Sequence, residues 1–143
     1  MTAVVRENSE NFVCALLTGA SPQNRLVIWD VFRRAGWRLY EARSRKQALA
    51  CLARFPLQVV IASCDTPGWP WKRAWQDLAR QPRPPQLVVT SRTADDTLWS
   101  EVLNWGGFDV LSEPLQREEV ARVIAAAGRH FNEQPGRARA ASA

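Results

Sequence analysis

Short, continuously apolar segments constrain the fold of this chain more than any other feature of its sequence. Residues 12–17 (FVCALL), 57–62 (LQVVIA) and 86–90 (QLVVT) each have the length of one strand. They lack the alternation of apolar and polar residues that marks a strand with one face in water. Each is therefore predicted to be covered on both faces, as in a parallel sheet. Residues 37–42 (WRLYEA) and 108–112 (FDVLS) are interpreted as two further strands.

Helical patterns separate these strands along the chain. Ser21 is a predicted N-cap followed by Pro22, and Gly36 is a suitable stop for the helix that lies between them. Apolar residues recur in this segment at helical spacing, and we expect them to face the core: Leu26, Trp29, Val31, Phe32 and Ala35.

Four more helices follow the same logic. Ser44 is predicted to cap a helix that ends before Pro56, and residues 71–80 (WKRAWQDLAR) form the next one. Thr93 with Asp96 resembles a capping box for the fourth helix. The last helix is expected over about 115–130, with four residues facing inward: Val120, Val123, Ile124 and Ala127.

Five strands thus alternate with five helices. Parallel strands need crossover helices, and such crossovers are right-handed, so this order predicts a three-layer α/β sandwich. We expect one domain over residues 11–131, a flexible N-terminus over 1–10 and a mobile tail over 132–143.

Composition excludes several classes of protein. The 143 residues are 46% apolar and 23% charged, which are globular proportions. No apolar run approaches the ~18 residues that a membrane-spanning helix needs, and the acidic, polar N-terminus is unlike a secretory signal. We therefore expect a cytoplasmic protein with no membrane partner. The cysteines (Cys14, Cys51 and Cys64) lack metal-type spacing, and His130 is the one histidine, so no metal site and no cofactor are expected.

The net charge of +5 permits contact with nucleic acid but does not require it. The basic residues are spread along the chain rather than gathered in one run. This distribution favours a solvated surface, and nucleic acid is an unfavoured partner.

Several short motifs occur at intervals that are specific in combination. The first helix opens with PQNRL, Pro67-Gly68 follows the end of the third strand, VVTSR spans the end of the fourth strand, and GGFDVLSEPL contains the fifth. Together they resemble the receiver domain of two-component response regulators over roughly residues 11–131. The resemblance implies a flavodoxin-like (βα)5 sandwich with sheet order 2-1-3-4-5 and a site at the carboxyl ends of the strands. It also implies a cis peptide bond between Glu113 and Pro114.

Receiver chemistry depends on carboxylates, and the resemblance places none of them here. Two acids after the first strand help to hold Mg²⁺, and this chain has Gly19 and Ala20 at those positions. A third acid accepts the phosphoryl group, and its position is occupied by Ser63.

The groups that act on the phosphoryl are also altered. The lysine that offsets the phosphate charge is replaced by Glu113, and the aromatic residue that receivers move on activation aligns with Val110. Only Thr90 matches the family pattern. Like charges about 4 Å apart cost ~4 kcal/mol at intermediate dielectric, so Glu113 would repel a phosphoryl group. These substitutions indicate a pseudo-receiver that is not an enzyme, with a vestigial phosphorylation pocket.

The function expected for such a chain is regulation by protein–protein interaction, with a kinase or a transcription regulator as partner. Three alternatives remain open. Phosphorylation could use a rearranged acceptor, Asp65 or Ser63. A transcription-associated module could contact nucleic acid through its basic surface. A third alternative is a flavodoxin-fold enzyme or small-molecule binder, because LLTGAS is similar to the start of a dehydrogenase phosphate loop, although the glycines that should follow are absent.

Tryptophans mark two candidate partner sites. Trp69, Trp71 and Trp75 crowd a loop and the helix after it, where a surface loop can seldom bury three indoles, so we expect exposed side chains there. Trp99 and Leu103 lie on the fourth helix. In receivers the face formed by the fourth helix, fifth strand and fifth helix serves dimerisation or output, so the resemblance implies a homodimer or partner surface that includes Val110. Trp29 and Trp105 are expected in the core.

Overall fold

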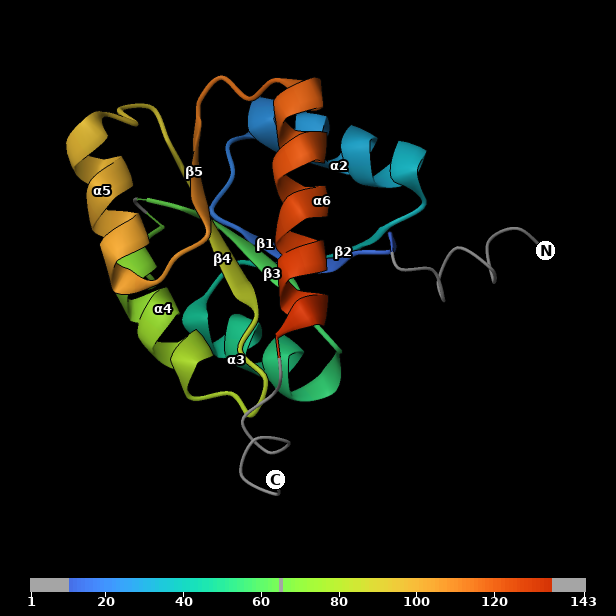
Figure 1. The fold of residues 1–143 in the computed structure, drawn as a ribbon, viewed down its shortest axis with the longest axis vertical. Helices are drawn as coiled ribbons and strands as arrows, with labels where there is room; N and C mark the ends of the chain where they lie inside the picture. Colours follow the sequence, from blue (N-terminus) through green and yellow to red (C-terminus); the bar gives the residue numbers. More distant parts are fainter. Residues whose placement is uncertain (1–10, 65, 135–143) are drawn as a thin grey trace.

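The computed structural model describes residues 11–64 and 66–134 (Figure 1). The strands are β1 (Cys14–Thr18), β2 (Arg38–Ala42), β3 (Val59–Ser63), β4 (Gln86–Ser91) and β5 (Asp109–Ser112). The helices are α2 (Pro22–Ala35), α3 (Arg45–Arg54), α4 (Trp71–Ala79), α5 (Asp96–Trp105) and α6 (Arg117–Glu133). All strand pairs are parallel and the sheet order is β2-β1-β3-β4-β5, which confirms the predicted fold class.

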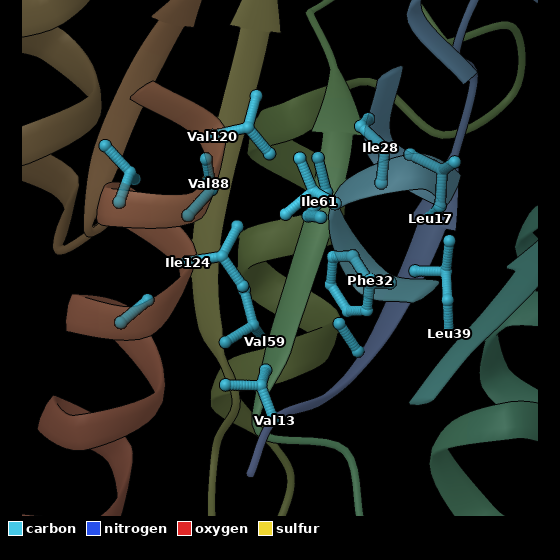
Figure 2. Packing of buried hydrophobic residues seen from close by; sticks show 14 of the residues in the cluster. Val13, Leu17, Ile28, Phe32, Leu39, Val59, Ile61, Val88, Val120 and Ile124 are labelled. Atoms are coloured by element: carbon cyan, nitrogen blue, oxygen red, sulfur yellow. The ribbon is translucent and has the colours of Figure 1, made fainter. Parts of the chain in front are cut away.

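The sheet lies between two layers of helices because its central strands are apolar on both faces. On one face, alternate residues of the strands pack against α2 and α6. Figure 2 shows this half of the core, in which Ile61 of β3 lies between Phe32 of α2 and Ile124 of α6. On the other face, Leu16, Val60 and the remaining alternate positions pack against α3, α4 and α5.

The register of the strands brings their carboxyl ends to one edge. Ser63 of β3 pairs with Thr90 of β4, and Thr18 of β1 pairs with both Ala42 and Ala62. The loops that leave these strands therefore meet at the same edge of the sheet. This edge positions the candidate site.

Most helix ends follow the sequence prediction. Ser21 Oγ accepts a hydrogen bond from the Asn24 amide (3.3 Å), and Ser44 Oγ accepts one from the Gln47 amide (3.1 Å). Gly36 ends α2 with φ 73°, a left-handed conformation that suits glycine.

The capping box predicted for α5 at Thr93 and Asp96 is wrong. The N-cap is Asp95, whose Oδ1 accepts from the Leu98 amide at 2.9 Å. Thr93 instead closes a turn on β4, because its amide donates to Ser91 Oγ (3.1 Å).

The predicted inward face of α2 is also wrong for two residues. Leu26 is 65% exposed and Trp29 is 37% exposed. The buried stripe of α2 runs instead through Asn24, Ile28 and Val31. At about 100° per residue, this stripe turns positions 26 and 29 toward solvent.

Parts of the chain with sequence predictions lie outside the described residues. These are residues 1–10, Asp65 and residues 135–143. Among the helices of the described ranges, none has both the length and the apolar character that crossing a membrane requires.

Candidate functional site

A hollow of about 470 Å³ lies where the carboxyl ends of the strands meet. Four of the five residues assigned to the vestigial pocket line it: Gly19, Ala20, Ser63 and Glu113. The remaining lining is formed by hydroxyl side chains and one guanidinium: Ser21, Ser91, Thr93 and Arg92. The fold therefore brings four of the predicted positions together from the ends of β1, β3 and β5.

Thr90 is placed differently from its predicted partners. It is buried within the sheet, where it pairs with Ser63 on one side and Leu111 on the other. The two residues after it, Ser91 and Arg92, line the hollow in its place.

Position 19 has no room for a side chain. Gly19 adopts φ 76°, and a Cβ built there would collide with Thr66 Oγ1. Thr66 is buried, and its hydroxyl donates to the carbonyl oxygen of Ser63 at 3.0 Å, which holds it in this position. An aspartate at position 19 would need both a strained backbone and a displaced Thr66.

These residues do not fit a magnesium ion. Mg²⁺ binds through carboxylates and other oxygens in near-octahedral geometry. Gly19 and Ala20 have no side-chain oxygen, and Ser63 offers a neutral hydroxyl in place of a carboxylate. Across residues 11–64 and 66–134, nowhere do three histidine, cysteine, aspartate or glutamate residues gather as a metal site would require.

Glu113 is tied to the start of α2. Asn24 Nδ2 donates to Glu113 Oε1 at 2.9 Å, and Asn24 Oδ1 accepts from the Leu115 amide at 3.2 Å. Between them lies Pro114, and the Glu113–Pro114 peptide bond is cis, as the resemblance implies. Asn24 is buried, and its bond with the Leu115 amide is buried while its bond to Glu113 is partly buried. The amide of one side chain thus joins α2 to the segment between β5 and α6.

Asn24 is not among the residues that the sequence predicts for this site. Its position in the first turn of a helix whose start lies at this edge was visible in the sequence. Its partners, however, are 89 and 91 residues away along the chain, and no local pattern relates them.

The expectation that Trp69, Trp71 and Trp75 are exposed is wrong. Trp69 and Trp71 are buried, and Trp75 is half-buried against the core. These three indoles are covered because α5 packs beside them. The Trp105 ring lies edge-on to Trp71 (centroids 5.5 Å apart) and to Trp75 (5.9 Å). Trp105 is itself half-buried in this cluster.

A buried acid on α4 explains the position of Trp69. Asp77 is 4% exposed, and its Oδ2 accepts a hydrogen bond from Trp69 Nε1 at 2.7 Å. Arg45 of α3 reaches both carboxylate oxygens, with Nε to Oδ2 at 2.9 Å and Nη2 to Oδ1 at 3.1 Å. The bond from Arg45, followed by that from Trp69, lowers the pKa of Asp77 below its ordinary value against the opposing effect of burial. These three residues hold the loop between β3 and α4 against the neighbouring helices.

The second predicted partner surface keeps an exposed indole. Trp99 of α5 is 48% exposed, and its Nε1 lies 3.4 Å from Asp109 Oδ1 of β5. Leu103 and Val110 are half-buried. Trp29 was predicted to be buried but is the other exposed indole in the described part of the chain. Its Nε1 donates to Glu41 Oε1 at 2.9 Å.

Comparison with known proteins reveals likeness at the level of structure. No family model matches the sequence, and no curated protein matches it significantly. A receiver domain of the Francisella response regulator 1452 superposes with a TM-score of 0.72 at 17% identity, covering 82% of this chain and 98% of that domain. The signal receiver domain of an HD domain-containing protein from Pseudomonas fluorescens Pf-5 gives 0.74 at 20% identity, covering 85% and 98%. The chemotaxis response regulator CheY4 of Vibrio cholerae gives 0.71 at 15% identity, covering 81% and 98%.

The fold is thus that of a response-regulator receiver domain, as the motifs predicted. At identities of 15–20% this likeness concerns the fold. The chemistry of this chain must be argued from its own residues.

Proposed function

We propose that this chain is a receiver-fold signalling module, formed by residues 11–131, that regulates a protein partner by binding and takes up no phosphoryl group. The observation that carries the proposal is the hollow at the carboxyl ends of the strands. Gly19 excludes an acid by its conformation and by contact with Thr66, Ser63 replaces the acceptor, and Glu113 brings a negative charge. A site of this composition lacks the carboxylate ligands for Mg²⁺, and it has Glu113 where the resemblance places the lysine that offsets phosphate charge, so Arg92 is the one cation in its lining.

Acetyl phosphate and beryllofluoride test this proposal directly. The chain is incubated with each reagent and Mg²⁺ beside a receiver domain that has the complete acidic site. Tryptophan fluorescence and intact mass are then recorded. We expect no saturable Mg²⁺-dependent fluorescence change and no added phosphoryl mass in this chain, while the control domain responds. A phosphoryl adduct that disappears in Asp65→Ala or Ser63→Ala would instead establish the rearranged-acceptor alternative.

An exposed aromatic side chain on α5 supports the proposal that this chain binds a protein partner. Trp99 is 48% exposed on α5, and Leu103 of the same helix and Val110 of β5 are half-buried. Aromatic residues that combine an apolar body with a polar N–H are enriched in the centres of interfaces. We assign the face formed by α5, β5 and α6 as the partner or homodimer surface.

Matched tryptophan variants distinguish this face from others. In a pull-down from an extract of the source cell, Trp99→Ala is expected to abolish capture of the partner protein. If the partner is a second copy of this chain, Trp99→Ala is expected to lower the fraction of dimer measured by analytical ultracentrifugation. Trp29→Ala removes an exposed indole from α2 and is the control, with expected binding equal to that of the unchanged chain. If Trp29→Ala alone abolishes capture of the partner, the partner surface lies on α2 and the assignment to the α5, β5 and α6 face is wrong.

A further inference from the structure

A second hollow, of about 320 Å³, lies at the opposite edge of the sheet from the site described above. This hollow opens to solvent and is bordered by the end of α3, the loop between α4 and β4, and the last turns of α6, which lie together at the lower end of Figure 1. Leu52, Phe55, Leu57 and Phe131 provide apolar walls. Its volume is at the small end of the ~300–1,000 Å³ range of ligand pockets.

Three prolines contribute to the remaining lining of the 320 Å³ hollow. Pro56, Pro82 and Pro85 line the hollow from two different loops. Proline has no backbone N–H and a fixed φ, so these loops present few donors and lose little freedom when a ligand binds. The hollow is therefore largely preformed, with an apolar interior.

Two polar side chains line this hollow, the Gln81 amide and the Arg83 guanidinium, and its lining includes no acidic residue. Arg83 is held in place by α6. Its Nη2 donates to the carbonyl oxygen of Phe131 at 3.1 Å, and its guanidinium carbon lies 4.2 Å from the centroid of the Phe131 ring. A guanidinium has five N–H donors, so this anchoring bond leaves donors for a ligand.

We propose that this hollow binds a small carboxylate with an aromatic or aliphatic body. The body would lie against Phe55, Leu57 and Phe131, and the carboxylate would accept hydrogen bonds from Arg83. A planar guanidinium fits a carboxylate in bidentate geometry, and its charge complements an anion where the lining has no competing acid. A neighbouring hollow of about 210 Å³ is also lined by Arg83, Pro85 and Phe131, so a longer ligand body has room beyond the guanidinium. This site does not depend on the proposed function, because it shares no residue with the receiver-type hollow.

Binding of 2-naphthoate to the full chain, measured by isothermal titration and saturation-transfer NMR, tests the proposal. Naphthalen-2-ylmethylammonium presents the same rings with a positive charge and is the ligand control. We expect naphthoate to bind at least about tenfold more tightly than the amine, because a hydrogen bond to a charged group contributes enough for such a ratio.

Arg83→Gln is expected to weaken naphthoate binding about tenfold or more. Arg80→Gln is the matched control, since Arg80 is an exposed arginine at the end of α4 that does not line the hollow, and its affinity should be unchanged. Leu52→Trp fills the hollow and should also remove binding, so it carries the test if Arg83→Gln fails to fold. The proposal is overturned if naphthoate does not bind, if acid and amine bind equally, or if binding survives Leu52→Trp.

Discussion

The buried carboxylate of Asp77 gives the sharpest test of how this fold is held together. Asp77→Ala removes the acceptor of Trp69 Nε1, whose indole is fully buried. It also releases Arg45, whose side chain is 37% exposed and can be rehydrated. The loss in free energy of unfolding therefore comes mainly from the Trp69 indole N–H, which is left without an acceptor.

The magnitude follows from the bond to Trp69. A hydrogen bond to a charged group contributes about 1.5–3 kcal/mol, and a buried donor left without a partner costs about 1–3 kcal/mol. We therefore expect Asp77→Ala to lower the free energy of unfolding by about 2–3 kcal/mol. Urea unfolding followed by far-UV circular dichroism measures this change, with an unaltered m-value indicating an intact native state. Glu101→Ala, which breaks the exposed ion pair with Lys72, is the control and should change stability by less than about 1 kcal/mol.

The pH dependence of stability in a further variant, Asp77→Asn, checks the electrostatic part of the argument. The folded-state pKa of Asp77 is lowered, so its ionised form stabilises the protein above the unfolded pKa near ~3.9. This contribution is lost as pH falls through the folded pKa. Asp77→Asn keeps an oxygen for Trp69 but cannot ionise, so its stability deficit should shrink as pH drops below about 4. A deficit that is constant between pH 7 and pH 3, or a loss below about 0.5 kcal/mol in Asp77→Ala, would refute the reasoning.

Two further substitutions test the receiver-type edge. Gly19→Ala and Gly68→Ala both place alanine at φ 76°, at a strain of about 1–2 kcal/mol, but only at position 19 does the new Cβ meet Thr66. Thermal unfolding should therefore show a larger loss for Gly19→Ala, and equal losses would contradict the contact. Asn24→Ala removes both bonds to the segment after β5 and should cost about 1–3 kcal/mol in urea unfolding, whereas the exposed neighbour Gln23→Ala should stay within about 0.5 kcal/mol.

The fold was predictable because its signals are local and agree with one another. The apolar run at 57–62 is a strand because a segment covered on both faces needs no polar alternation. The caps at Ser21 and Ser44 depend on a side chain and an amide three residues away, so the sequence contains both partners. The positions of the vestigial site followed from motifs that adjoin these strand ends.

The features of the structure that could not be predicted depend on interaction partners that are far apart in the chain. The burial of Trp69 requires Asp77 on the next helix and Arg45 on α3, which is 32 residues from Asp77. A charged residue in a helix is ordinarily solvated, so its sequence position gave no sign of burial. The exposure of Leu26 was missed for a related reason: apolar spacing alone does not fix which stripe of a helix the sheet will cover.

At the receiver-type edge, the positions where the resemblance places acids and a lysine are engaged in interactions of their own. Thr66 fills the space in which a side chain at position 19 would stand, and its hydroxyl is engaged with Ser63. Glu113, where the resemblance places a lysine, holds Asn24 and thereby α2. A carboxylate introduced at position 63 alone would add a second negative charge to a hollow that already contains Glu113 and whose lining has Arg92 as its one cation. Under the proposed function, phosphoryl chemistry at this edge would therefore require simultaneous changes at the ends of several strands.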